Sequence, residues 1–203
     1  MESEPICAIS TPSGSGAIAV IRVDGNDVFS LVDKVFKPTG TDEPVQSLTP
    51  RKMYLGKVYD GEQLVDEILL VTYQAPHSYT GNNMIEISCH GSRYIQQKLL
   101  QLLIHQGARM AGAGEFTMRA FYNGKMDLAQ AEGVADLIAS SSSAAHKLAL
   151  QQMRGGFSAE IQHLRDKLLN FISLIELELD FSEEDVEFAD RRQLKVLITE
   201  IDE

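Results

Sequence analysis

The chain changes character near Glu115, and this change constrains its fold more than any other feature. Before Glu115, short runs rich in Val and Ile alternate with turns of Gly, Pro, Ser and Asp, which is typical of strands and loops. After it there is no proline and no further strand pattern, and apolar residues recur every three or four positions, as on one face of a helix. The pattern predicts an α+β protein. We expect a mixed α/β domain over residues 1–118 and an all-α helical bundle segment over residues 119–203.

Strands and two helices are expected in the first domain. Asn26 or Asp27 can cap a first helix over residues 28–36. Ser92 can cap a second helix, which Gly107 ends. The strand-like runs cover residues 5–9, 17–23, 53–59, 65–73 and 84–89.

The second part is predicted to consist of helices with short breaks. Asp127 can cap the first helix, and the serine run at residues 140–143 is a break between helices rather than a linker. A long helical stretch follows, and we expect Gly155-Gly156 to kink its start. The apolar residues of this stretch have the spacing of a seam between two packed helices: Phe157, Ile161, Leu164, Leu168, Ile172, Ile175 and Leu179.

The segment at residues 181–190 interrupts this pattern with dense carboxylates. Ser182 and Asp185 fit the start of a new helix, which would run from Arg191 to the end of the chain. We interpret the segment as a helix cap with a solvated acidic face, and a metal site is the alternative. The last helix has no stop signal, which indicates a piece of a longer protein.

The charge balance limits the partners of this chain. Among its 203 residues it has 18 Lys and Arg against 29 Asp and Glu, a formal net charge of −11. Because nucleic-acid binding depends on clustered cations, this balance argues against a broad nucleic-acid surface, although a local basic pocket remains open.

The sequence carries no signal for a membrane or for secretion. No apolar run is long enough to span a bilayer, and the acidic N-terminus lacks the basic region of a signal peptide. Cys7 and Cys89 form no CxxC motif, and a metal site built on two cysteines is not expected. We expect both to be reduced, buried thiols of a cytoplasmic protein.

Motifs for nucleotide hydrolysis and nucleophilic catalysis are also missing. The phosphate-loop pattern GxxxxGK[ST] does not occur, because neither Gly56-Lys57 nor Gly124-Lys125 is followed by the hydroxyl that would hold Mg²⁺. GxSxG and HExxH are absent as well. His77 and His90 lie near expected loops and are interpreted as local hydrogen-bonding residues. We therefore predict no catalytic residue and no metal site in this chain.

Three charged residues occupy unusual positions. Arg22 ends an apolar strand beside a Gly-rich turn, where its planar fork could bind a carboxylate or phosphate. Glu86 lies between apolar strand neighbours, so it faces water or a cleft, where it could accept two N–H donors from a pterin or purine. Lys125, together with Arg119, places positive charge beside a Gly-rich segment. An ordinary surface role is the alternative for each of these residues.

Several long motifs resemble one family. TPSGSGAIAVIRVDG, SYTGNNMIEISCHG and GEFTMRAFYNGKMDLAQAEGVADLIASSS are similar to the N-terminal part of the tRNA-modification GTPases of the MnmE (TrmE) family. LQQMRGGFSAEIQHLRDKLLNFISLIELELDFSEEDVEF resembles the first half of that family's central helical domain. The resemblance covers essentially the whole chain. It departs from the family in two loops, TPSGSGA and AGAG, where the family more often has a further proline.

The resemblance implies a fold and a function. The N-terminal domain would be similar to the folate-binding domains of one-carbon enzymes, and a Ras-like GTPase domain would be inserted into the helical domain. With a flavin-dependent partner of the MnmG type, such proteins modify C5 of the wobble uridine, position 34, of tRNA. The N-terminal domain would bind 5-formyl-tetrahydrofolate or a related reduced folate and mediate homodimerisation. GTP, Mg²⁺ and K⁺ would bind only in the GTPase domain, so these 203 residues should not hydrolyse GTP.

The resemblance also assigns the folate contacts by motif. They fall on Arg22 in AVIRV, Glu86 in MIEIS and Lys125 in NGKMD. The two cations would offset carboxylates or ring substituents of the folate, and Glu86 would hold the pterin edge. One alternative is a structural dimerisation module with a vestigial folate pocket. Another is direct docking of tRNA on this chain, which its acidity disfavours.

Overall fold

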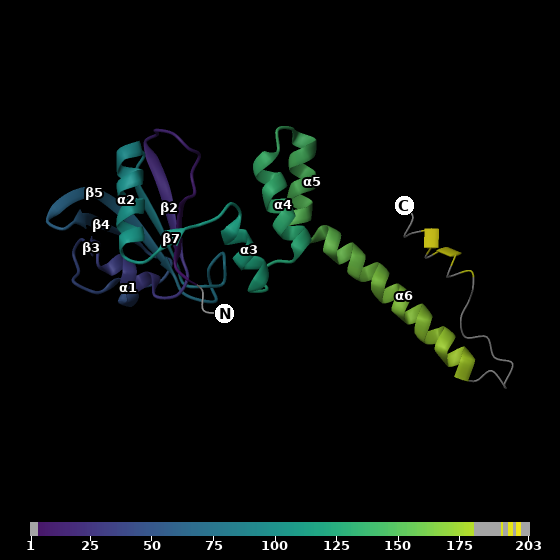
Figure 1. Ribbon diagram of the computed structural model, residues 1–203. Coiled ribbons are helices and arrows are strands. Elements are labelled where there is room, and N and C mark those ends of the chain that lie inside the picture. Colours follow the sequence, from purple (N-terminus) through teal and green to yellow (C-terminus); the bar gives the residue numbers. More distant parts are fainter. Residues whose placement is uncertain (1–3, 181–191, 193–194, 197, 200–203) are drawn as a thin grey trace. The chain divides into compact units, whose positions relative to one another are not determined.

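The computed structural model describes residues 4–180, 192, 195–196 and 198–199. The chain divides into two compact units, Met1–Met126 and Asp127–Glu203 (Figure 1). The first unit is built on a mixed sheet and the described part of the second is helical, so the predicted α+β class is confirmed. The domain boundary predicted between residues 118 and 119 lies inside helix α3 (Glu115–Tyr122), several residues before the division at Met126. The predicted boundary stays a prediction.

Seven strands of the described residues form one sheet, in the order β3-β4-β5-β6-β2-β1-β7. Neighbouring strands are antiparallel except β1 and β7, which are parallel. Every strand predicted for the first domain is present, and β4 and β5 form an antiparallel pair. The strands are β1 (Ile6–Ile9), β2 (Ile18–Asp24), β3 (Phe36–Pro38), β4 (Met53–Asp60), β5 (Gln63–Tyr73), β6 (Met84–His90) and β7 (Arg109–Met110).

Helices α1 (Val28–Asp33) and α2 (Arg93–His105) pack with the sheet around a single hydrophobic core (Figure 1). Burial of these apolar side chains is the main favourable term for the fold of this unit. Asp27 and Ser92 occupy the N-cap positions, as predicted, although neither side chain makes a capping hydrogen bond. The largest fully buried side chains include Phe36, Ile6, Ile21, Leu48, Ile68, Leu70, Met84, Ile85, Ile87 and Leu103.

The first helix is shorter than predicted. It ends at Asp33, whereas the apolar spacing extended it to residue 36, and Phe36–Pro38 forms strand β3 instead. Phe36 lies opposite Val58 of β4 and is almost fully buried. Gly56 makes room for it, because a Cβ atom at this position would overlap the Phe36 ring. The predicted helix end was therefore wrong, since pairing with a distant strand outweighs the local helical spacing.

Three short elements of the structure were not predicted from the sequence pattern. Strand β7 has two residues, which is too few to show any period. Helix α3 has eight residues and begins after Gly114, whose φ of 70° places the N-cap in the left-handed region. A 3-10 helix, η1 (Val45–Ser47), lies within the polar connection between β3 and β4. None of these elements was predicted.

The second unit contains α4 (Leu128–Ala139), α5 (Ser143–Met153) and α6 (Gly156–Asp180). Asp127 caps α4 as predicted: its carboxylate accepts from the Gln130 backbone N–H at 2.8 Å, and the Gln130 side chain accepts from the Asp127 N–H at 2.9 Å. The serine run separates α4 from α5, also as predicted.

The start of the long helix differs from the expectation. Gly155, with a φ of 79°, lies between α5 and α6, so the expected kink is a break between two helices. Within the seam predicted for α6, Phe157 and Ile161 are more than half exposed. The acidic segment at residues 181–190 and the helix start expected at Arg191 lie outside the described residues.

A buried carboxylate, that of Glu115, ties α3 to strand β7. Glu115 accepts two hydrogen bonds from the Arg109 guanidinium, at 2.6 and 2.8 Å, and one from Arg119 at 3.2 Å. The hydrogen bonds from Arg109 lower the pKa of Glu115 to about 2 against the opposing effect of burial, and the Gly112 backbone N–H and Arg119 add to this. The ionised carboxylate therefore helps to fix α3, which contributes to the site described below.

We predict that Glu115→Gln destabilises the first unit and weakens its response to acid. Because the folded-state pKa of about 2 lies below the ordinary value of 4.5, the ionised group stabilises the fold fully above about pH 5, and this contribution is lost as the pH falls toward 2. The shift corresponds to roughly 3 kcal/mol at most. Urea unfolding should show a deficit of about 2–3 kcal/mol for the variant near neutral pH, which shrinks on acidification.

Glu43→Gln, at an exposed site in the same unit, is the matched control. It should leave the free energy of unfolding within about 0.5 kcal/mol of wild type. Equal free energies of unfolding for wild type and Glu115→Gln near neutral pH would contradict the prediction.

Candidate functional site

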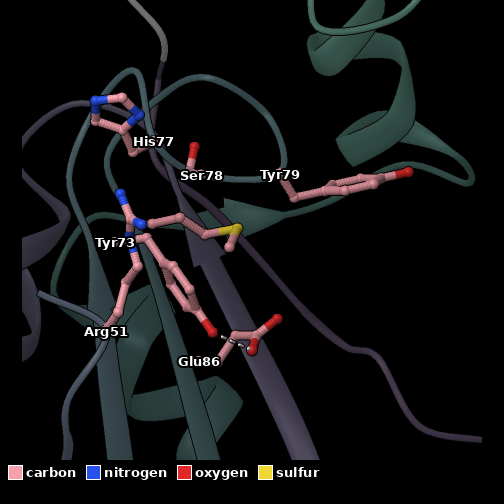
Figure 2. A pocket seen from close by; sticks show the side chains of 7 residues that line it. Arg51, Tyr73, His77, Ser78, Tyr79 and Glu86 are labelled. Carbon is pink, nitrogen blue, oxygen red and sulfur yellow. Dashed lines mark hydrogen bonds between the residues drawn. The ribbon is translucent and has the colours of Figure 1, made fainter.

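An open pocket of about 370 Å³ lies in the first unit, beside the ends of β5 and β6 (Figure 2). This volume is in the range of small-molecule sites in proteins. Part of its wall comes from the segment between these two strands, residues 74–83, which we call the pocket loop. The residues that line the pocket are Arg51, Tyr73, His77, Ser78, Tyr79, Met84 and Glu86.

The strand register brings Arg22 and Glu86 together. They lie directly opposite each other on β2 and β6. The Arg22 Nη2 and Nε atoms both donate to Glu86 Oε1, at 2.7 and 3.1 Å. Both side chains are about one quarter exposed, at 23% and 26%. The charge of Arg22 is therefore already matched by a carboxylate within the protein.

Tyr73 holds the other oxygen of the same carboxylate. Its hydroxyl donates to Glu86 Oε2 at 3.2 Å, as the dashed line in Figure 2 marks. Burial raises the pKa of Tyr73, and the negative charge and hydrogen bond of Glu86 raise it further. Tyr73 therefore stays a protonated donor at neutral pH and fixes the orientation of Glu86.

Aromatic rings cover the Arg22 guanidinium. Its Cζ atom lies 5.1 Å from the centre of the Tyr79 ring and 5.5 Å from the centre of the Phe116 ring. Both distances fall within the range of cation–π attraction. Because Tyr79 belongs to the pocket loop and Phe116 to α3, this packing joins the Arg22–Glu86 pair to both segments.

Lys125 approaches the pocket loop from a different direction. Its Nζ atom donates to the backbone carbonyl of Pro76 at 3.0 Å. Its stem passes beside Gly81, where a Cβ atom would come within 3.3 Å of the Lys125 Cγ. Lys125 is not among the residues that line the pocket. The structure thus pairs Arg22 with Glu86 and places Lys125 against the loop that forms the wall.

The buried carboxylate of Asp24 anchors the pocket loop. Asp24 has no solvent exposure, and it accepts hydrogen bonds from the Thr80 hydroxyl and, at 3.0 Å, from Asn82 Nδ2. It also accepts from Arg119 Nη1 at 2.9 Å. Arg119, whose charge beside a Gly-rich segment was unexplained in the sequence, therefore joins α3 to β2 and the loop.

Further bonds hold the pocket loop on α3 and its end. The Tyr79 and Thr117 hydroxyls are 2.8 Å apart. Asn123 Nδ2 donates to the Thr80 carbonyl at 2.7 Å. A loop held at several points presents its side chains in a fixed geometry, which reduces the entropy cost of ligand binding.

Sequence reasoning missed several residues of this site. Arg51 and Tyr73 line the pocket, yet no motif or period singled them out. His77, interpreted as a local hydrogen-bonding residue, lines the pocket as well. His90 lies elsewhere, with its Nδ1 atom 2.6 Å from the buried Asp66 carboxylate.

Other expectations concern thiols, metals and membranes. Cys7 and Cys89 are buried and free, as predicted, and burial raises the pKa of each thiol to about 11. In the part of the chain that the structure describes, no group of three or more His, Cys, Asp and Glu side chains is arranged to hold a metal ion. The helices among those residues are all too short or too polar to cross a membrane.

Two family models match the chain. Residues 5–125 match the model described as the GTP-binding protein TrmE N-terminus, and residues 128–203 match the MnmE helical domain. The tRNA modification GTPase MnmE of Bacteroides fragilis (strain ATCC 25285) is 57% identical over 203 residues, which is 100% of this chain and 43% of that protein.

Two other bacteria have similar proteins with the same name. Those of Christiangramia forsetii and Cytophaga hutchinsonii are 57% and 51% identical over 199 residues, which is 98% of this chain and 42% of each relative. The chain therefore spans less than half the length of these curated relatives.

We predict that Asp24→Ala destabilises the first unit and loosens the pocket loop. The change removes the ion-pair partner of Arg119, whose side chain is 11% exposed, and an acceptor of Thr80 and Asn82. Losing one partner of a buried ion pair costs about 3–5 kcal/mol, and we expect about 3 because Glu115 still accepts from Arg119. Hydrogen exchange should speed up at the backbone amides of residues 78–83.

Asp42→Ala, which removes an exposed carboxylate, is the control. It should change neither the free energy of unfolding in urea nor the exchange rates of the pocket loop. Unchanged exchange rates in the pocket loop of Asp24→Ala would show that other contacts hold this loop.

Proposed function

This chain belongs to the MnmE (TrmE) family of tRNA-modification GTPases, and on that premise we propose that its first unit binds a reduced folate of the 5-formyl-tetrahydrofolate type. We further propose that it mediates homodimerisation within a protein that modifies C5 of the wobble uridine of tRNA. The MnmG-type flavoprotein is the proposed partner, and the cytoplasm the proposed location. The folate would bind in the pocket beside Arg22, Glu86 and Lys125.

The carboxylate of Glu86 carries the proposal. An ionised carboxylate offers about four lone-pair sites, two on each oxygen. Arg22 donates two hydrogen bonds to Oε1, whereas Oε2 receives one, from Tyr73. Oε2 therefore keeps capacity for an N–H donor from a ligand in the pocket. The edge of a pterin ring presents N–H donors, so the carboxylate fits the group that the family implies.

Arg22 supports this contact indirectly. Because two of its N–H groups donate to Glu86, Arg22 fixes the direction of that carboxylate. Lys125 uses one of its three donors on the Pro76 carbonyl, which leaves two for a ligand at the rim of the pocket loop. Both residues thus have a proposed binding role, although Arg22 would act through Glu86.

The remaining functions would reside outside these residues. The chain contains no phosphate loop, so we propose that GTP, Mg²⁺ and K⁺ bind in parts of the protein beyond it. Its net charge of −11 argues against direct docking of tRNA, so tRNA would be engaged through the complex.

An exposed apolar face of the sheet supports homodimerisation. Met53, Leu55 and Leu69 are 59%, 51% and 37% exposed. Leu55 and Leu69 lie directly opposite each other on β4 and β5, and Met53 lies opposite Val71, so these side chains form adjoining rows. Neighbouring apolar side chains exposed in this way mark protein interaction surfaces. We propose that a second copy of the chain covers them.

We predict that Glu86→Ala weakens the binding of 5-formyl-tetrahydrofolate about 10- to 100-fold, because the ligand loses a charge-assisted hydrogen bond. Isothermal titration calorimetry measures the affinity, and the rise in Tm with added folate provides a second readout. Glu67→Ala removes a carboxylate from the neighbouring strand β5 and is the matched control.

The same titration separates the proposal from its alternative. A vestigial pocket would give no calorimetric signal and no rise in Tm with the wild-type protein. Binding with equal affinity to wild type and Glu86→Ala would instead remove Glu86 from the site.

We predict that Leu55→Lys dissociates the homodimer, since a buried, unpaired charge would replace an apolar contact in the interface. Sedimentation velocity should show a dimer for wild type and a monomer for the variant. Ile104→Lys, which also replaces an exposed apolar residue but on α2, should remain dimeric. If the Leu55→Lys variant still sediments as a dimer, the interface lies on another surface.

A further inference from the structure

We propose that Arg51 binds the anionic end of the ligand in this pocket, which in a reduced folate is the carboxylate of the glutamate tail. The inference rests on the folate-binding function proposed above and names a residue that neither the sequence motifs nor the resemblance assigns. Arg51 is the arginine that lines the pocket directly.

Two other cations lie near the pocket but do not line it. Arg22 is paired with the Glu86 carboxylate, and Lys125 contacts the outer side of the pocket loop through the Pro76 carbonyl. Arg51, in contrast, lines the pocket directly, and among the described residues its guanidinium makes no hydrogen bond or ion pair. A guanidinium has five N–H donors in a planar fork, which suits a carboxylate.

The backbone holds Arg51 in an unusual conformation. Its φ is 61°, in the left-handed region that residues other than glycine rarely adopt. The Arg51 N–H donates to the Thr72 carbonyl at 2.8 Å, next to Tyr73 of the pocket wall. Residues held in such conformations cluster at ligand sites, where the surrounding structure fixes a side chain in a needed direction.

The pocket therefore has two chemically different sides. In Figure 2 the Arg51 guanidinium lies on the side of His77, and the Glu86 carboxylate lies on the other side, beyond the Tyr73 ring. One side presents donors with positive charge and the other presents an acceptor with negative charge. A ligand that matches both carries N–H donors at one end and an anionic group at the other. A folate has this arrangement, with its pterin and its glutamate at opposite ends.

Calorimetry with two related ligands tests the assignment. One ligand is 5-formyl-tetrahydrofolate, and the other is 5-formyl-tetrahydropterin, which lacks the aminobenzoylglutamate tail. Arg51→Met keeps the length of the side chain but removes its charge and donors. It should weaken the binding of the folate about 10- to 100-fold and change that of the pterin less than about threefold.

Two further variants serve as controls. Arg51→Gly also removes the guanidinium, but glycine adopts a positive φ without strain, so a retained Tm with lost folate affinity separates binding from folding. Arg93→Met removes an exposed arginine at the first position of α2 and should bind both ligands like wild type.

Each result supports or overturns the inference. Wild-type folate affinity in Arg51→Met would overturn it and leave the proposed folate function standing. Equal losses for both ligands would assign Arg51 to the pterin ring and overturn its assignment to the carboxylate. No binding of either ligand by wild type would overturn the proposed function, and this inference with it.

Discussion

The pocket depends on the need to neutralise one buried carboxylate. Asp24 has no solvent exposure, and a buried charge without partners would cost several kcal/mol of desolvation. Asp24 meets this need at the end of β2 with Thr80 and Asn82 of the pocket loop and with Arg119 of α3. Three segments that are distant in the chain are therefore held at one point, and the wall of the pocket follows from this.

Charge matching also separates the structural cations from those available to a ligand. Arg119 neutralises Asp24, and Arg22 neutralises Glu86, so neither carries an unmatched charge. The Glu86 carboxylate keeps an oxygen with spare acceptor capacity, and the Arg51 guanidinium on the pocket wall donates to no group in the described part of the chain. Acceptor and donor functions thus remain on opposite sides of one pocket in an acidic protein.

Much of the fold could be predicted because it follows from local patterns. The β4–β5 hairpin has alternating apolar residues around an Asp-Gly turn, and the capping box of α4 lies within four consecutive residues. The prediction was wrong at Phe36, where helical spacing continues into a residue that pairs with β4. It missed β7 and α3, because elements this short show too little periodicity.

The candidate site was less accessible to sequence reasoning. Arg22 and Glu86 were noticeable as charges within apolar strands, but no local pattern indicates that they form a pair. Arg51 had no signal, because its left-handed backbone, its hydrogen bond to the Thr72 carbonyl and its place on the pocket wall exist only in the folded chain.

By itself the sequence determined the α+β class, the order of most strands and helices and the burial of the cysteines, because periodicity, turn chemistry and hydrophobicity act between neighbours in the chain. Only the tertiary structure decided which charges meet. Antiparallel register sets Arg22 opposite Glu86, the pocket loop and α3 converge on Asp24, and Arg51 is left facing the pocket. Electrostatic pairing depends on distance in space and on exclusion of water, and both are fixed only when the strands and α3 have packed.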